Sequence, residues 1–188
     1  MPSHRILGLT AGLFLLFAVP ARGQGFISPF GGYNFGGDSA NCASVQNCEE
    51  KRLNLGVSVG TTHGIFGFEE DIAYARDFFG KTPGGNNAML TVMSNLMLVV
   101  PAGPIQPYAL IGLGLMRPHL QLDAVSLALD KNALGYDIGG GLNIFLGHAI
   151  GIRGDVRHLR TLQDVTLGVF SHDQIDFWRA SAGITLRF

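Results

Sequence analysis

Acidic and basic side chains recur at alternate positions inside otherwise apolar segments of this sequence, and residues of one parity share one face of a β-strand. Carboxylate and guanidinium groups on such a face can form charge-assisted hydrogen bonds with one another. The acidic members are Glu69, Asp71, Asp137 and Asp155, and the basic members are Arg153, Arg157, Arg179 and Arg187. Four charges of each sign predict a buried ion-pair network, whereas a pore lined for one sign of ion would carry one dominant charge.

Other residues could bind a metal or a cofactor, but their context argues against it. His172, Asp173 and Asp176 could hold a cation, although exposed loops often carry such residues without a site. The glycine run at residues 139–141 lacks the strand–turn–helix context of a nucleotide site. We therefore expect no metal and no cofactor.

The two cysteines of the chain, Cys42 and Cys48, lie in a polar segment at residues 38–51. Their spacing is not C-x-x-C and that segment contains no histidine, which argues against a redox or metal pair. In an oxidising compartment, two cysteines this close predict a disulfide that closes a loop and contributes roughly 2 kcal/mol.

The segments that carry the charged residues alternate with a period of two. Between Asn132 and Leu146, apolar side chains occupy nearly all even positions, and small or polar side chains occupy nearly all odd positions. This period is typical of strands, because a helix would mix the two sets on its faces. The same pattern predicts eight strands, at residues 26–37, 52–62, 65–78, 88–100, 107–117, 132–146, 149–159 and 175–188.

The connections between these strands alternate between long and short, as in a transmembrane β-barrel with long outer loops and short periplasmic turns. We predict an all-β fold, an eight-stranded antiparallel up-and-down barrel with its charges in the lumen and its apolar face on lipid. A soluble barrel would instead bury the charged face in an apolar core, at a large cost. Glu70 is the exception, because strict alternation points it towards lipid.

Composition and the N-terminal segment agree with an exported barrel. The chain has 27 glycines among 188 residues and only 14% charged residues, against about 7% glycine and about 25% charge in an average soluble domain. A net charge of −1 with 13 Lys and Arg excludes a typical nucleic-acid binder. Residues 1–23 predict a signal peptide, with a basic start and an apolar run at residues 6–19. Residues 24–188 are then the barrel domain.

Six stretches resemble the bacterial outer-membrane β-barrel domain family, whose better-known relatives are small eight-stranded barrels of the OmpA and OmpX type. They are PFGGYNFGGD (29–38), FGFEEDIAYA (66–75), PYALIGLGLMR (107–117), GYDIGGGLNIFL (135–146), GIRGDVRHLR (151–160) and FWRASAGITLRF (177–188). The resemblance implies insertion by the barrel assembly machinery, with the terminal Phe188 as the assembly signal. It implies no particular activity, because the family includes adhesins, integrity factors and narrow pores.

Some small outer-membrane barrels modify lipid A, and His158 is the candidate residue for such catalysis in this chain. The segment RHLR around this residue is similar to the motif of lipid A deacylases, which place a serine two residues after the histidine. Here that position is Arg160, and Thr161 has the wrong parity. The departure removes the nucleophile that such a mechanism needs, so we predict no enzyme and no catalytic residues.

Taken together, the sequence predicts a non-enzymatic barrel in the bacterial outer membrane, surrounded by lipid that includes lipopolysaccharide. Its role would be envelope integrity or surface interaction, with any surface partner bound through the long loops. The alternative is a narrow, porin-like channel for small solutes or ions. The loop at residues 118–131 carries several apolar residues, which indicate either strands that continue above the membrane or a partner-binding patch.

Overall fold

The structure is a computed structural model that describes residues 23–39, 52–79, 85–122, 127–130, 132–162, 165–167, 170–172 and 174–188. These residues form strands and connections. No helix among them is long and apolar enough to cross a membrane. The strands are β1 (Gln24–Phe35), β2 (Leu53–His63), β3 (Phe66–Arg76), β4 (Gly85–Val99), β5 (Ile105–Leu122), β6 (Leu127–Asp130), β7 (Ala133–Phe145), β8 (Ile150–Thr161), β9 (Val165–Leu167), β10 (Phe170–His172) and β11 (Asp176–Arg187).

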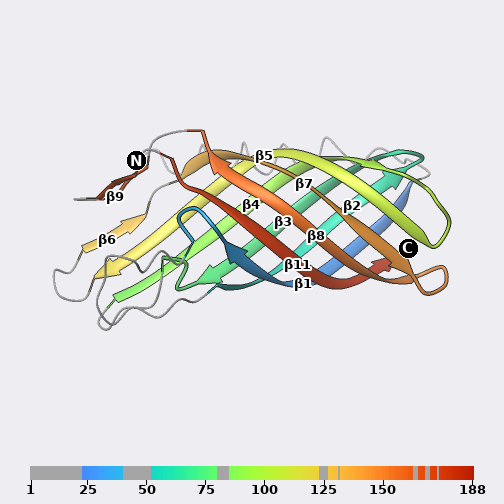
Figure 1. Ribbon diagram of the computed structural model, residues 1–188, viewed down its shortest axis with the longest axis horizontal. Helices are drawn as coiled ribbons and strands as arrows, with labels where there is room; N and C mark the ends of the chain where they lie inside the picture. Colours follow the sequence, from blue (N-terminus) through green and yellow to red (C-terminus); the bar gives the residue numbers. More distant parts are fainter. Residues whose placement is uncertain are drawn as a thin grey trace, which may run out of the picture.

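Eight long strands close into a barrel (Figure 1). Neighbouring strands pair antiparallel in the order β1, β2, β3, β4, β5, β7, β8 and β11, and β11 pairs back with β1. Closure leaves no sheet edge within the ring, as a bilayer requires, since unpaired backbone groups are costly in hydrocarbon. The predicted number, order and parity of the long strands are confirmed.

The alternation of the sequence becomes the two surfaces of the barrel wall. In β2, Leu53 and Leu55 are exposed on the outer face, whereas Asn54 and Ser58 are buried on the lumen face. In β8, Ile152 and Val156 face outwards, whereas residues of the opposite parity are buried. An exposed apolar belt faces lipid and a polar interior is shielded from it, which is the reverse of a soluble protein.

The short turns contain glycines in the left-handed backbone region. Gly64, between β2 and β3, has φ +60°, and Gly147, between β7 and β8, has φ +107°. An L side chain is unfavourable at such φ values, so glycine allows these tight reversals at the end opposite the long loops.

The far end of the barrel differs from the sequence prediction in the length of its strands. β5 continues to Leu122, and β6 pairs with its outer part, with Leu120 opposite Leu129. The apolar residues of the loop at 118–131 therefore include strand extensions, as one of the two interpretations proposed. A second hairpin, β9 with β10, lies within the predicted loop at residues 160–174. The sequence pattern did not predict β6, β9 and β10, because strands of three or four residues are too short to show a clear alternation.

Candidate functional site

The lumen is filled by three layers of side chains, and the outer layer is apolar. Phe78 contacts Phe79 and Phe177 edge to face, with ring centroids 4.9 and 4.7 Å apart. This cluster lies towards the long-loop end and buries its side chains almost completely. Its other buried members are Ala75, Met89, Met93, Met116, Ala133, Leu159 and Ile175. Phe78 lies two residues beyond the end of β3, where strict alternation no longer fixes the direction of a side chain, and it is buried in this cluster.

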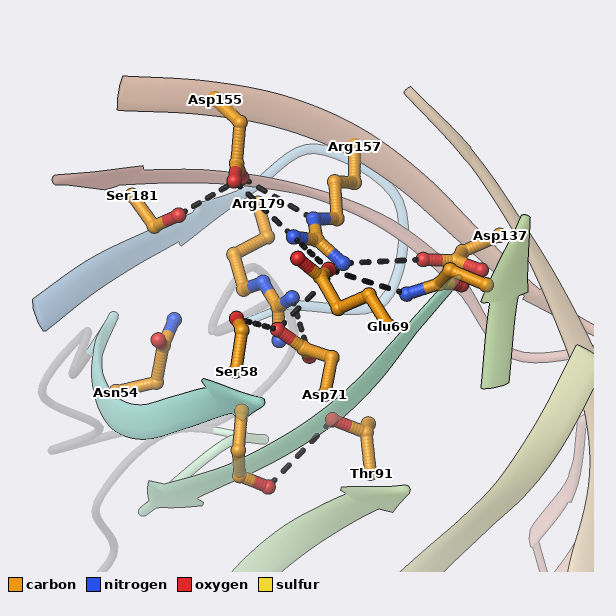
Figure 2. A network of polar contacts seen from close by, with 12 residues as sticks. Asn54, Ser58, Glu69, Asp71, Thr91, Asp137, Asp155, Arg157, Arg179 and Ser181 are labelled. Carbon is orange, nitrogen blue, oxygen red and sulfur yellow. Dashed lines mark hydrogen bonds and ion pairs between the residues drawn. The ribbon is translucent and has the colours of Figure 1, made fainter. Parts of the chain in front are cut away.

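Below this apolar layer lies an ionic layer centred on Arg157 (Figure 2). Its Nη2 atom is 2.9 Å from Oε1 of Glu69 and 3.1 Å from Oδ2 of Asp155. Its Nη1 atom is 3.5 Å from Oδ2 of Asp71 and 3.6 Å from Oδ2 of Asp137. One fully buried guanidinium thus contacts three carboxylates on two other strands, β3 and β7, and one carboxylate on its own strand, β8.

Arg153 ties the ionic layer to the inner end of the lumen. Its Nη1 atom donates to Glu69, and its Nε atom donates to the hydroxyl of Tyr108 over 2.7 Å. That hydroxyl in turn donates to Asp155 over 2.8 Å, and the guanidinium lies 4.7 Å from the Tyr108 ring centroid. Tyr108 is part of the network that sequence analysis missed, because its parity marks a lumen position but its ring suggests only packing.

Arg179, the cross-strand neighbour of Arg157 on β11, completes the network. Its Nη2 atom is 2.6 Å from Oδ1 of Asp71, and its guanidinium lies over the ring of Phe30 at 5.0 Å. Ser58 donates to the other oxygen of Asp71 over 2.9 Å. Ser181 likewise donates to Asp155 over 2.8 Å. These serines lie at lumen positions of β2 and β11, and only their parity could have identified them.

Asn95 and Gly112 lie beside Asp137, where one provides hydrogen bonds and the other provides space. Asn95 pairs with Gly112 across β4 and β5, and Gly112 pairs with Asp137 across β5 and β7. With its amide oriented to satisfy both neighbours, Asn95 donates to Asp137 over 2.7 Å and accepts from Arg157 over 3.1 Å. A Cβ atom at Gly112 would overlap the side chains of Asn95 and Asp137. Glycine is therefore required here to leave room for the network.

Arg187 does not join the ionic layer, so this part of the prediction is wrong. It is the last residue of β11 and donates to Gln106 over 2.9 Å, with its guanidinium 3.5 Å from the Phe145 ring centroid. Parity places it on the lumen face, but its position along the strand is at the inner mouth, away from the carboxylates. Among the described residues, the layer therefore holds four carboxylates and three guanidinium groups rather than equal numbers.

The inner layer is again largely apolar. Phe26, Met97, Val99, Tyr108 and Leu110 form a buried cluster between the ionic layer and the short-turn end. A cavity of about 20 Å³ lies beside this cluster, and another of about 10 Å³ lies between the ionic layer and the outer cluster. Each has room for about one water molecule.

Glu70 and His158 lie on the lipid-facing side of the wall. Glu70 has the orientation that alternation predicts, and the hydroxyl of Ser94 donates to its two carboxylate oxygens at 2.8 and 2.9 Å. His158 lies 3.6 Å from Asp176 and packs against Trp178, with ring centroids 4.9 Å apart. Arg160, which occupies the position of the deacylase nucleophile, donates to Gln174 over 2.7 Å.

Several predictions concern residues outside the described ranges. These are the signal peptide predicted for residues 1–23, of which residue 23 alone is described, and the disulfide between Cys42 and Cys48. Asp173 and the side chain of His172, at which no metal was expected, also lie outside the described part. Asp176 is described and faces His158. Phe188 is also described, and its backbone exchanges two hydrogen bonds of 2.9 Å with Gly25. Its role as an assembly signal stays a prediction.

The comparisons agree on one architecture. Residues 9–188 match the family described as "Outer membrane protein beta-barrel domain", whereas no curated protein matches the chain. Neisserial surface protein A is 12% identical with a TM-score of 0.63, over 89% of this chain and 98% of that one. The N-terminal barrel domain of Pseudomonas aeruginosa OprF is 14% identical with a TM-score of 0.55, over 89% and 100%.

A third similar structure is Ail, the attachment invasion locus protein of Yersinia pestis, in complex with the heparin analogue sucrose octasulfate. It is 14% identical, with a TM-score of 0.57 over 89% of this chain and 100% of that one. At such identities, the likeness to solved structures shows a shared fold.

Proposed function

This chain belongs to the outer membrane protein β-barrel domain family and resides in the bacterial outer membrane, where we propose that it acts as a closed, non-enzymatic barrel. In this proposal the barrel contributes to envelope integrity or surface interaction, and its lumen conducts neither solutes nor ions. The long-loop end would carry any surface contact, because loops held by a rigid barrel are the adaptable part of such a scaffold.

The observation that carries the proposal is the filling of the lumen at three successive levels. An ion that crosses the barrel would have to pass the outer aromatic cluster, displace the Arg157 network and then pass the inner cluster around Phe26. Each carboxylate of the network is held by at least one guanidinium group. Removing one partner would leave buried charges unpaired, which is costly. Eight strands also leave an interior that side chains alone can fill.

Single-channel conductance of residues 24–188 in a planar lipid bilayer tests the proposal. Protease resistance of the same preparation in vesicles first shows that the barrel is inserted. We expect no discrete current steps from the inserted wild-type protein. Reproducible steps would contradict the closed lumen and favour a narrow channel for small solutes or ions.

A charge-balanced pair of substitutions shows which layer closes the lumen. Glu69→Gln together with Arg153→Gln removes one carboxylate and one guanidinium that contact each other. If the ionic layer is the barrier, current steps appear in this variant only. Arg187→Gln is the matched control, because Arg187 lies on the lumen face outside the network, and it should remain silent.

A further inference from the structure

The lipid-facing wall is hollowed where β11, β1, β2 and β3 lie side by side. The groove has a volume of about 720 Å³ and runs towards the long-loop end of these strands. Its lining includes Gly31, Tyr33, Leu55, Tyr74, Arg76 and Ala182. Exposed apolar side chains provide most of this surface, so the groove suits a hydrocarbon chain.

The strand register explains the hollow. Gly31 pairs with Ala182 on one side and with Leu55 on the other, and Leu55 pairs with Tyr74. Two small residues therefore lie beside two large ones in the same row of the outer face. No lumen side chain requires the glycine, since a Cβ atom at Gly31 would meet only Leu55 Cδ2, at 3.8 Å.

Arg76 lies at the outer end of this groove. It is the last residue of β3, has the lipid-facing parity and is exposed. No hydrogen bond or ion pair joins it to another residue in the part of the chain that the structure describes. Tyr33 and Tyr74 flank the groove below it, and both are about half exposed, as expected for aromatic rings at a membrane interface.

We propose that this groove binds the lipid A portion of lipopolysaccharide, with one acyl chain along Gly31 and Ala182 and a lipid A phosphate on Arg76. A planar guanidinium can donate two hydrogen bonds to a phosphate. The long-loop end of the barrel faces the outer leaflet, where lipid A places several acyl chains beside phosphorylated sugars. The inference rests on the membrane location in the proposed function and deepens its envelope role, but it does not depend on a closed lumen.

The chain provides its own reporter for this site. Trp178 is its single tryptophan, and it lies on the lipid-facing side of β11, two residues from Ala180 and 44% exposed. The protein is reconstituted in vesicles of phosphatidylcholine with brominated acyl chains, which quench tryptophan fluorescence on contact. Unbrominated lipid A is then added, and recovery of fluorescence measures how strongly it replaces the brominated lipid.

We expect lipid A to replace brominated phosphatidylcholine about fivefold better than its mole fraction predicts, which is the effect of one arginine near an anionic headgroup. Phosphatidylethanolamine and lipid A without its phosphates should show no such preference. Arg76→Gln should abolish the preference by removing the charge, and Gly31→Phe should abolish it by filling the groove.

Matched controls lie on β5, directly across the ring from β1. Arg117→Gln removes an arginine near the outer end of that strand, and Ala109→Phe adds the same bulk to an exposed alanine on its lipid face. Both should retain the wild-type preference. Heat-dependent electrophoretic mobility and far-ultraviolet circular dichroism show that each variant is folded.

Three outcomes would overturn the inference. The first is a wild-type protein whose fluorescence recovery follows the mole fraction of lipid A alone. The second is a loss of the lipid A preference in the β5 controls as large as the loss in Arg76→Gln and Gly31→Phe. The third is a wild-type tryptophan that brominated chains do not quench, in a protein that cross-links as a dimer, because a second copy would then cover the groove. Conductance is measured separately, so failure of this test leaves the closed lumen untouched.

Discussion

Strand β3 places consecutive carboxylates on opposite sides of the barrel wall, and their surroundings differ completely. Glu69 and Asp71 point into the lumen, are fully buried and contact the guanidinium groups of Arg153, Arg157 and Arg179. Glu70 lies between them in the sequence but faces lipid, where Ser94 is its hydrogen-bond partner. A single residue of register thus moves a carboxylate from a charge-paired network into a surface built for hydrocarbon.

The comparison shows that position in the wall decides what a charge contributes. In the lumen, each carboxylate is stabilised by groups from strands that are distant in sequence, so the network links the barrel across its diameter. On the outer face, a carboxylate at membrane depth lies in hydrocarbon, where a charged side chain is unfavourable. The lumen face therefore gains stability from charge, whereas the outer face gains it from the absence of charge.

The largest effect is expected from Arg157→Ala. This substitution leaves four carboxylates without their shared guanidinium, and breaking a buried ion pair typically costs about 3–5 kcal/mol. The free energy of unfolding in urea, measured in vesicles by Trp178 fluorescence, should fall by about that amount.

Arg187→Ala is the control for the loss of a long basic side chain on the same face. Because Arg187 contacts Gln106 and the Phe145 ring rather than a carboxylate, its replacement should cost about 1.5 kcal/mol, the low end of the range for a hydrogen bond with one charged partner. Equal unfolding midpoints for the wild type and Arg157→Ala would contradict the role of the network in stability.

A second prediction compares glycines on the two faces of the wall. Gly112→Ala places a methyl group against Asn95 and Asp137 in the lumen, and overpacking of this kind costs about 1–3 kcal/mol. Gly154 faces the membrane side, where an added Cβ atom lies 3.8 Å from the nearest heavy atom, the carbonyl oxygen of Ser181.

Gly154→Ala should therefore leave the unfolding midpoint unchanged within about 0.5 kcal/mol. The same urea titration measures both variants. If the two substitutions were equally harmful, the lumen would not be more tightly filled than the outer wall near these residues.

The difference between the two faces also explains what the sequence could predict. Parity alone assigned Glu69, Asp71, Asp137 and Asp155 to the lumen, because alternation in a strand depends on local geometry. It could not determine the depth of each residue along the barrel axis, which depends on tilt and register between strands. Arg187 was for that reason grouped with a network that lies deeper in the lumen.

Like depth along the barrel axis, contacts between strands could not be predicted from the sequence. Tyr108 bonds to Arg153 and Asp155 because the order of the ring places β5 close to β8, with only β7 between them. Phe78 lies just beyond a strand end, where alternation no longer fixes the direction of a side chain. The lipid-facing groove depends on which small and large residues become cross-strand neighbours, and single-strand patterns contain no such information.

The smallest predicted effect concerns the outer side of β3. Glu70→Leu removes a carboxylate from the lipid-facing wall, where a charged side chain at mid-depth costs up to about 2–4 kcal/mol for Lys or Arg and less for Glu. The hydrogen bond from Ser94 offsets part of that cost, so we expect unfolding in urea to require about 1 kcal/mol more than in the wild type. Ser94→Ala should shift stability slightly in the opposite direction, because it removes the partner and leaves the carboxylate in place. Destabilisation by Glu70→Leu would instead show that the outer face, like the lumen, depends on a charge for its stability.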